Sequence, residues 1–554
     1  MSSPEVAARG IHAPHWSWRW RLALLLVLVG AAALRLPGIE WGLPNAAHPA
    51  WSFHPDEAFH LDWARRLAAG QPIAQHFQYG GTLHYTVLNA CYRYGTLLAE
   101  TLGGFNPLAN AILVARYCAT LCSLLSIALV AAIGARLFDA RTGVVAALLL
   151  ALAPAHAFLA QNLRPDELAG LLASVLLWLG TLVYGGRAST DRRLFLLAGL
   201  VLGLAVALRF PLIAFGIAPA AGWLCREARG KFPLATLVPL CLWLVLAMLA
   251  GYALGSPHTL LYWRVVLEGL RLQAGYQQGL FLDTLDDSGS AWHMLWLLPR
   301  EALGTPAYLL ALLGVGLGFL GRRRAHWLLT ASVLPYLLGT SLVSWTVVRY
   351  SLPASPALAL LAAAGLRELG QRGRATATLA GLLLAGSVLW TGAADIAFAR
   401  VQAGLNVREQ VADWLAARAR PDASYVAFRL YALQDFYAPV TPAGHYSAWL
   451  DVSGPADPLV IETKTDPVIT DLIVPEPVYR GLDRWGAQHP HPGARRLHRL
   501  LRPDGFYRLE REFKVPVTLL GIDFTARFRS QDFFVINPGF RLYRRVADAS
   551  PGAP

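Results

Sequence analysis

Residues 134–179 read GARLFDARTGVVAALLLALAPAHAFLAQNLRPDELAGLLASVLLWL, and the order of features in this stretch decides the fold. A basic segment comes first, an apolar run follows it, Arg-Pro-Asp-Glu comes next, and a second apolar run closes the stretch. Proline in the first turn of a helix loses no hydrogen bond, and acidic residues there favour the helix dipole. We therefore expect two membrane-crossing helices, with Asp166 and Glu167 at the membrane edge where the second one starts.

The composition of the whole chain is that of a polytopic membrane protein. Of its 554 residues, 55% are hydrophobic and 15% are charged, and the mean hydropathy is +0.42, whereas soluble domains carry about 25% charged residues. The net charge of +13 does not indicate nucleic-acid binding, because the basic residues fall in short clusters between apolar runs. Such clusters orient membrane spans. The five cysteines lie in or near apolar runs, which is typical of small buried side chains.

Apolar runs long enough to cross a bilayer, about 20 residues, recur along the first part of the chain. The first run is expected to stay uncleaved rather than act as a signal peptide, because Arg35 follows it closely. If the N-terminus is cytoplasmic, the five inner connections are all basic, as the positive-inside rule requires. These connections are GARLFDARTG, GGRASTDRR, CREARGK, GRRRAH and RELGQRGR. The eleven expected spans are 21–38, 109–135, 143–160, 168–185, 194–209, 211–225, 234–254, 303–320, 326–345, 352–368 and 375–393.

This topology divides the chain into two domains. Residues 1–393 are expected to form a mostly α-helical membrane module, and residues 394–554 a soluble α/β domain on the outer face. The outer loops of the membrane module are 39–108 and 255–302. Both Pro-Asp-Glu motifs therefore fall on the outer side.

The outer segments carry their own secondary-structure signals. The amphipathic stretch 82–103 predicts a helix lying flat on the membrane surface, and 259–275 predicts a second helix. In the C-terminal domain, NVREQVADWLAARAR predicts an amphipathic helix over 406–420. Short strands are expected at SYVAF, PLVIETK, TDLIV, FKVPVTLLGI, FFVIN and FRLYRRV.

The Pro-Asp-Glu motif occurs twice, at Asp56-Glu57 after the first span and at Asp166-Glu167. Each motif fits a helix start, which is its structural interpretation. The functional hypothesis is that carboxylates from both motifs converge, because charges at a membrane edge are costly unless they are used or solvated. One carboxylate would accept a proton as a general base, and the other would orient the acceptor or hold a divalent cation. Asp56 and Asp166 would be the ligands of such a metal, whose identity and need stay open.

Single basic and aromatic residues on the outer side admit two interpretations. Arg349 at a span end either binds phosphate with its forked guanidinium or reaches the interface as a snorkelling side chain. Arg209 lies at a similar depth, and Arg164 precedes the second acid pair and offsets its charge. The outer histidines lack ligand spacing, so we interpret them as interfacial or helix-end residues; they are His54, His60, His84 and His258.

Taken in order, these motifs resemble the membrane glycosyltransferases of the GT-C fold. The nearest likeness is to the phospholipid-carrier-dependent branch related to protein O-mannosyltransferases and aminoarabinose transferases, similar to glycosyltransferase family 39. The likeness runs over most of the chain, and the order of its motifs is more specific than any one of them. The motifs are HPDEAFH, the block 134–179, LGLAVALRFPLIAF, SPHTLLYWRVVLEGL, VVRYSLPASPALALLAAAGL, REQVADWLAAR and FFVINPGFRLYRR.

The resemblance implies an enzyme that transfers a hexosyl or pentosyl group from a polyprenyl-phosphate donor in the outer face of the cytoplasmic membrane. By position, Asp56 would be the catalytic base, Glu57 its neighbour and Asp166 the second acidic residue. The chain lacks the Pro-Pro pair and basic residue that some relatives have near GGTLHY. The sugar, the acceptor (glycan, lipid or protein) and any cofactor stay open. The implied substrate-binding residues are Glu167, Arg164, Arg349, Tyr350, His84, Tyr85 and His258.

Two other functions compete with the enzyme. A transporter of a polar or lipid-linked substrate is the main alternative, but transporters tend to show internal repeats and ionisable groups near the midplane. No repeat is evident here, and the acids cluster at span ends. A scaffold subunit is the third class. An enzyme would turn over a lipid-linked sugar and lose this activity in Asp56→Asn, whereas a scaffold would keep its function.

Overall fold

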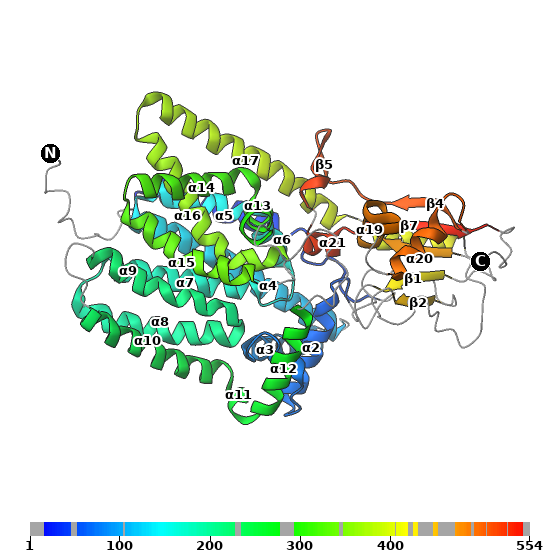
Figure 1. The fold of residues 1–554 in the computed structure, drawn as a ribbon, viewed down its shortest axis with the longest axis horizontal. Helices are drawn as coiled ribbons and strands as arrows, with labels where there is room; N and C mark the ends of the chain where they lie inside the picture. Colours follow the sequence, from blue (N-terminus) through cyan, green and yellow to red (C-terminus); the bar gives the residue numbers. More distant parts are fainter. Residues whose placement is uncertain are drawn as a thin grey trace.

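The chain forms a bundle of helices with a smaller α/β part packed against one end of it (Figure 1). The bundle helices α7, α8 and α10 run side by side, and the strands lie beyond the bundle's end. The structure is a computed structural model. It describes residues 16–45, 52–102, 106–227, 234–277, 293–342, 347–404, 406–418, 425–429, 447–451, 471–488, 492–505, 507–528 and 530–546.

Helical segments overlap each of the eleven expected ranges, although two ranges hold broken segments: α5 with α6 in 143–160, and η4 with α9 in 211–225. The third expected span corresponds to the bent pair α5 and α6, which is broken ahead of Pro154 because proline cannot continue the helix. The fourth expected span corresponds to α7. The bundle helices are α1 Trp18–Arg35, α4 Pro107–Leu137, α5 Ala140–Ala151, α6 Pro154–Phe158, α7 Asp166–Gly185, α8 Ala188–Leu208, η4 Phe210–Gly216, α9 Ile217–Glu227, α10 Leu234–Gly255, α14 Thr305–Leu320, α15 Arg324–Ser341, α16 Ser355–Gly370 and α17 Arg374–Ala403.

Length and composition mark fewer of these helices as membrane-crossing. Among the described residues, four are long and apolar enough: Pro107–Leu137, Asp166–Gly185, Leu234–Gly255 and the stretch that begins at Arg374. The pair Ala140–Ala151 and Pro154–Gln161, bent by 67°, makes a fifth if it counts as one span. The helix positions therefore agree with the sequence analysis, while eleven crossings stay a prediction.

The predicted inner connections gather at one end of the bundle and pair with one another. Arg367 at the end of α16 contacts Asp139, which caps α5, at 2.9 Å. Arg226 of α9 pairs with Asp191 of α8. The remaining links are Arg323 with Glu368 at 3.2 Å and Arg324 with the Cys225 carbonyl at 3.1 Å. These segments share one side, as the predicted topology requires; which side of a membrane it faces stays a prediction.

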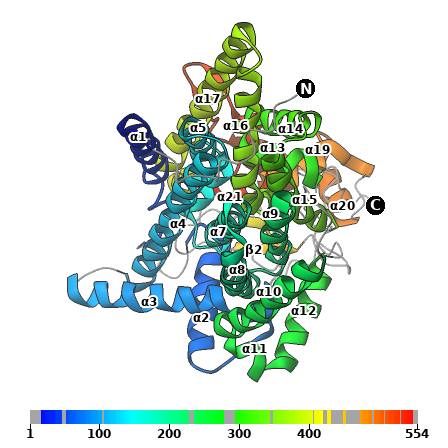
Figure 2. The same cartoon turned by 90° about the vertical axis from the view of Figure 1, so that its left-hand side faces the viewer.

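The opposite end of the bundle carries short helices that run across it. The amphipathic stretch 82–103 forms α3, Leu83–Leu102, and Figure 2 shows α3 lying across the direction of helices seen end-on. The stretch 259–275 falls on two helices, α11 and α12. The helices at this end are α2 Pro55–Ala68, η2 Ala74–Phe77, η3 Leu159–Gln161, α11 Pro257–Leu261, α12 Trp263–Gln277, η5 His293–Leu297, α13 Leu298–Leu303 and η6 Val348–Ala354.

The C-terminal part is a five-stranded sheet in the order β2-β1-β3-β7-β4. β1 is parallel to β2 and β3, and β7 is antiparallel to β3 and β4. The amphipathic helix α18 buries Val407, Val411 and Leu415 against the sheet, as its pattern predicts. The elements are α18 Val407–Ala417, β1 Tyr425–Arg429, β2 Ser447–Asp451, β3 Asp471–Pro475, α19 Glu476–Trp485, η8 Gly486–Gln488, α20 Pro492–Leu501, β4 Tyr507–Phe513, β5 Thr518–Leu519, β6 Ile522–Asp523, η9 Thr525–Arg527, α21 Gln531–Ile536 and β7 Phe540–Arg545.

Four details differ from the sequence analysis or lie beyond it. FKVPVTLLGI is not one strand, because its residues are divided between the end of β4, β5 and the start of β6. FFVIN is not a strand but most of α21, because Phe533 packs into an aromatic cluster and this tertiary contact outweighs strand propensity. The expected domain boundary at 394 falls inside α17, which continues to Ala403. The segment PLVIETK lies outside the described residues.

An aromatic cluster joins the two parts of the molecule. Phe398 of α17 stacks on Phe528 at 4.4 Å between ring centroids and meets Phe158 of α6 at 4.5 Å. Phe533 of α21 lies 5.1 Å from Phe528. Aromatic pairs at these separations add to the energy of area burial. The cluster therefore fixes α21 against the end of the bundle.

Candidate active site

The two Pro-Asp-Glu motifs meet at the end of the bundle beside α21. At the first, the His54 ring caps α2 by accepting from the Asp56 backbone N–H at 3.2 Å. The Arg164 guanidinium, just before α7, donates to both Asp56 and Asp166, with 3.2 Å from its Nε to Asp166 Oδ2. Two carboxylates from distant segments are thus joined by one guanidinium, as the hypothesis of convergence expected.

Arg209 brings a second cation to the same carboxylates. It follows α8 and donates to Asp166 Oδ1. Its guanidinium carbon lies 5.0 Å from the ring centre of Tyr350 and 5.7 Å from that of Tyr79. Cation–π contacts of this kind hold a guanidinium in place without neutralising its charge. Tyr350 therefore lies next to the ion pairs, while its expected role in substrate binding stays a prediction.

Arg349 in η6 completes the set of cations, and a residue that the sequence analysis missed faces it. Asp532 of α21 accepts from the Arg349 side chain and, at 3.0 Å, from the Arg349 backbone N–H. Asp532 is 6% exposed and Arg349 is 7% exposed, so the pair is shielded from water. The C-terminal part thus contributes a carboxylate to the site.

Arginine neighbours set the electrostatics of Asp56. Burial raises its pKa, but Arg164 and the nearby His54 and His60 outweigh burial, so the pKa of Asp56 lies well below its usual value. Burial lowers the pKa of Arg164, but Asp56 and Asp166 raise it by more than burial lowers it, so the pKa of Arg164 is above its usual value. Three guanidinium groups (Arg164, Arg209 and Arg349) thus face three carboxylates (Asp56, Asp166 and Asp532).

Glu57 is not part of this arrangement. Both of its oxygens bind the guanidinium of Arg116 from the middle of α4, at 2.9 and 2.7 Å. They also accept from the Ser52 hydroxyl at 2.7 Å and from the Leu163 N–H at 3.0 Å. Glu57 and Arg116 are both fully buried. Glu57 therefore links α2, α4 and the segment before α7, and the structure brings it to Asp56 only as a chain neighbour.

Glu167 is likewise separate from Asp166. Its carboxylate is 1% exposed, lies 3.7 Å from His156 Nε2 and has no hydrogen-bond partner among the described residues. Arg35 at the end of α1 donates to the His156 carbonyl at 3.1 Å, which puts a guanidinium in the same region. Glu167, expected to bind substrate, thus faces a buried polar cluster inside the bundle.

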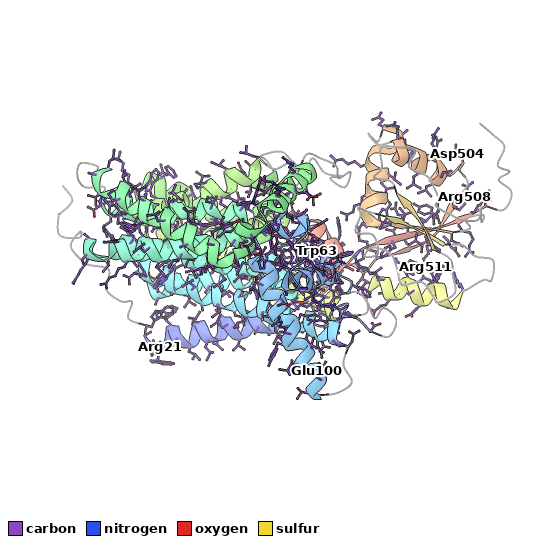
Figure 3. All side chains as sticks on the ribbon, turned by 90° about the horizontal axis from the view of Figure 1, so that it is seen from below. Arg21, Trp63, Glu100, Asp504, Arg508 and Arg511 are labelled. Atoms are coloured by element: carbon purple, nitrogen blue, oxygen red, sulfur yellow. The ribbon has the colours of Figure 1, made fainter. Side chains whose placement is uncertain are left out.

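His84 and Tyr85 lie in an aromatic cluster next to Asp56. His60 Nδ1 and His84 Nε2 are 3.1 Å apart, and Tyr85 lies 5.3 Å from the His84 ring and donates to the Gln75 carbonyl. His258 is further along: its Nδ1 is 3.3 Å from Thr82 Oγ1 at the start of α3. Of these three expected residues, His84 is linked through His60 to the surroundings of Asp56. Figure 3 labels Trp63, which packs on His60 in this cluster.

Burial of the histidines predicts an acid-sensitive fold. Burial, partly offset by Glu57 for His54 and by Asp56 for His60, lowers the pKa of each imidazole to about 4. An unfolded histidine titrates near 6.5, so the unfolded chain binds more protons between pH 6.5 and 4, and stability is lost as the pH falls through this window. We expect the thermal unfolding midpoint in detergent to be lower at pH 4.5 than at pH 7. The difference between the two pH values is expected to be smaller in His60→Asn. Equal drops in both proteins would contradict this assignment.

The site offers no ready metal cage within the described part of the chain. No group of three or more His, Cys, Asp and Glu side chains there is arranged to hold a metal ion. Asp56 and Asp166, the ligands that the sequence analysis named for any metal, both pair with guanidinium groups. These two carboxylates do not by themselves make a metal site.

A comparison with protein families bears on this geometry. Residues 103–260 match the family described as Dolichyl-phosphate-mannose-protein mannosyltransferase. The resemblance to phospholipid-carrier-dependent glycosyltransferases is confirmed over this range. The matched range contains Arg164, Asp166 and Arg209 and therefore three of the ion-pair residues. The family points to a membrane glycosyltransferase that uses lipid-linked donors. The comparison with curated protein sequences gave no match.

Solved structures of low identity were also found. ArnT from Cupriavidus metallidurans bound to undecaprenyl phosphate is 14% identical with a TM-score of 0.46, over 97% of this chain and 100% of that chain. The oligosaccharyltransferase AglB from Archaeoglobus fulgidus, in complex with an inhibitory peptide and a dolichol-phosphate, is 12% identical with a TM-score of 0.49, over 77% and 64%. Arabinofuranosyltransferase AftD from Mycobacteria is 17% identical with a TM-score of 0.39, over 97% and 42%.

Proposed function

We propose that the protein is an integral membrane glycosyltransferase that moves a hexosyl or pentosyl group from a polyprenyl-phosphate donor to an acceptor on the outer face of the cytoplasmic membrane. One observation carries the proposal: Asp56 and Asp166 share the guanidinium of Arg164 at one end of the bundle, next to Arg209 and Arg349. Paired acids and cations at one place match the needs of sugar transfer from a phosphate carrier. The acids can serve the acceptor, and the cations can serve the donor.

The proposed reaction uses Asp56 as the general base. The acceptor hydroxyl gives its proton to the Asp56 carboxylate as its oxygen forms a bond to the anomeric carbon of the sugar. The bond from that carbon to the phosphate oxygen breaks, and its electron pair leaves with the polyprenyl phosphate. The guanidinium groups of Arg349 and Arg209 stabilise the negative charge that grows on this phosphate. Asp166 orients the acceptor and holds Arg164.

The low pKa of Asp56 makes donor binding a condition for catalysis. A carboxylate paired with Arg164 is a weak base, because its pKa lies well below the operating pH. A phosphate competes with Asp56 for the forked guanidinium of Arg164. When Arg164 turns to the phosphate, Asp56 loses its partner and becomes a stronger base. Donor binding would thereby strengthen the base that deprotonates the acceptor hydroxyl, whereas in the free enzyme the ion pair with Arg164 keeps Asp56 a weak base.

A turnover assay tests the proposed function directly. Purified protein in lipid would be given a panel of polyprenyl-phosphate sugars with candidate glycan, lipid and peptide acceptors. Release of free polyprenyl phosphate together with glycosylated acceptor supports the enzyme. Movement of an intact lipid-linked sugar across the bilayer without release would favour the transporter instead. The same assay in EDTA decides whether turnover requires a divalent metal.

Replacing Arg349 by Gln is expected to weaken donor binding. Loss of a charge-assisted hydrogen bond costs about 1.5–3 kcal/mol, so we expect the donor KM to rise by about 10- to 100-fold. The variant leaves Asp532 without its guanidinium partner, so its control is Arg349→Gln combined with Asp532→Asn, which removes both charges. An unchanged donor KM in both proteins would show that Arg349 serves only to hold α21.

A further inference from the structure

A short β-hairpin with a two-residue turn projects from the C-terminal part where this part meets the bundle (Figure 1). Its strands are β5 Thr518–Leu519 and β6 Ile522–Asp523, which pair antiparallel. The turn is Leu520-Gly521, with φ of +51° and +82°. Positive φ at both positions is what a type I′ turn requires, and Asn-Gly is the usual sequence there.

Leucine is the unexpected residue in this turn. A non-glycine residue with positive φ is uncommon, and Asn and Asp accept it more readily than a branched apolar side chain does. The Leu520 side chain also packs on nothing, since Leu520 is 94% exposed, and the neighbouring Ile522 is 50% exposed. Neither turn geometry nor the protein's own core explains two large apolar side chains at this tip.

The base of the hairpin is attached to the middle of α17 and to the start of α14. Phe524, directly after β6, meets the ring of Trp390 on α17 at 5.1 Å. Arg527 donates to the Thr391 hydroxyl at 3.3 Å, and a Cβ on Gly304, just before α14, would lie 2.6 Å from the Arg527 side chain. The hairpin is therefore held at the level where α14 begins and close to the end of the span expected at 375–393.

The hairpin is attached beside an exposed apolar face of α17. That helix belongs to a stretch long and apolar enough to cross a membrane, and it exposes Leu379, Leu382, Leu383, Leu389, Trp390 and Ile396. Trp390 and Arg527 side by side are typical of the interface between lipid and water. A cavity of about 330 Å³ lies here, and its charged lining residues balance: they are Arg300, Arg527, Glu301 and Asp523.

We propose that the β5–β6 hairpin is a membrane anchor, with Leu520 and Ile522 inserted into the lipid bilayer beside α17. The partner is the bilayer itself, because the hairpin is attached beside α17, whose exposed face is apolar, and because its tip exposes nearly all of Leu520 and half of Ile522. The charges beneath the tip cancel, so the anchor is expected to show no selectivity for anionic lipids. The anchor sets the C-terminal part, and with it α21, at a fixed height above the membrane. The inference does not depend on the proposed enzymatic activity.

Depth-dependent fluorescence quenching tests the anchor. The full-length protein, with its five cysteines replaced by serine, would carry an environment-sensitive NBD label on Leu520→Cys in phosphatidylcholine nanodiscs. Doxyl-labelled lipid is expected to quench this label at least threefold more than a label on Asp504→Cys. Asp504 is an exposed residue at the far side of the C-terminal part (Figure 3). Equal quenching at both positions would overturn the proposal.

A second variant separates membrane contact from hairpin folding. Leu520→Asn suits the positive φ of the turn but removes the apolar side chain. With the label on Ile522→Cys, we expect lipid quenching to fall at least twofold in Leu520→Asn, with an unchanged unfolding midpoint. Should the cysteine-free protein not fold, hydrogen exchange of residues 518–523 in the native chain gives the answer. Faster exchange in Leu520→Asn than in the unaltered protein in nanodiscs supports the anchor, and equal exchange overturns it.

Discussion

Asp56→Asn is expected to lower kcat by about 10²- to 10⁴-fold, the range that a general base contributes. The amide cannot take the proton of the acceptor hydroxyl, while Arg164 keeps its other carboxylate partner, Asp166, so the fold persists. Turnover would be followed as release of polyprenyl phosphate with saturating donor. The donor KM is expected to change much less than kcat, because the phosphate is held by the arginines.

A matched control lies on the same helix. The side chain of Asp62 on α2 is about half exposed, and among the described residues its salt bridge is with Arg66 one turn away, at 2.7 Å. Asp62→Asn makes the same chemical change without touching the ion-pair network and is expected to leave turnover within twofold of the unaltered enzyme. A loss below tenfold in Asp56→Asn, with both variants folded, would remove Asp56 as the base and leave Asp166 as the next candidate.

Glu57→Gln is expected to destabilise the protein by about 3–5 kcal/mol, because breaking a buried ion pair leaves a charge without compensation. The stranded charge is that of Arg116, which is fully buried in the middle of α4. The free energy of unfolding would be measured by denaturant titration in mixed micelles. The folded fraction is expected to keep a kcat near that of the unaltered enzyme, which a catalytic role for Glu57 would not allow.

The double variant Glu57→Leu with Arg116→Leu supplies the control for this effect. Removing both charges is expected to restore part of the stability lost in Glu57→Gln, since apolar side chains often replace buried ion pairs at little cost. A double variant that is less stable than Glu57→Gln would contradict the assignment. A large loss of kcat in folded Glu57→Gln would instead return Glu57 to the reaction.

The helices of the bundle were predictable because each expected span is a long apolar run between charged or proline-containing segments. The runs 109–135 and 168–185, for example, correspond to α4 and α7 within a few residues. The strand expected at FFVIN was wrong because its aromatic residues satisfy strand and helix patterns alike. Only the contact of Phe533 with the bundle decides between them.

Site residues that belong to a local sequence motif could be predicted. Site residues that are defined only by contacts between distant segments could not. Asp56 and Asp166 follow from two copies of one motif, and convergence followed from placing both on one side. The role of Arg116 was missed, although a lone arginine inside an apolar run is a signal that a buried partner exists. Asp532 could not be predicted in this way, because no neighbouring residue in the sequence links it to Arg349, which lies 183 positions earlier.

The ion pair between Arg349 and Asp532 joins the bundle to the C-terminal part, so an exchange of the C-terminal part would change this contact. A relative that exchanges its C-terminal part by recombination would receive a foreign side chain at the point where the donor phosphate is expected to bind. An incoming segment with no carboxylate at the position of Asp532 would leave the buried guanidinium of Arg349 without this ion-pair partner, which is expected to weaken the junction between the two parts of the molecule.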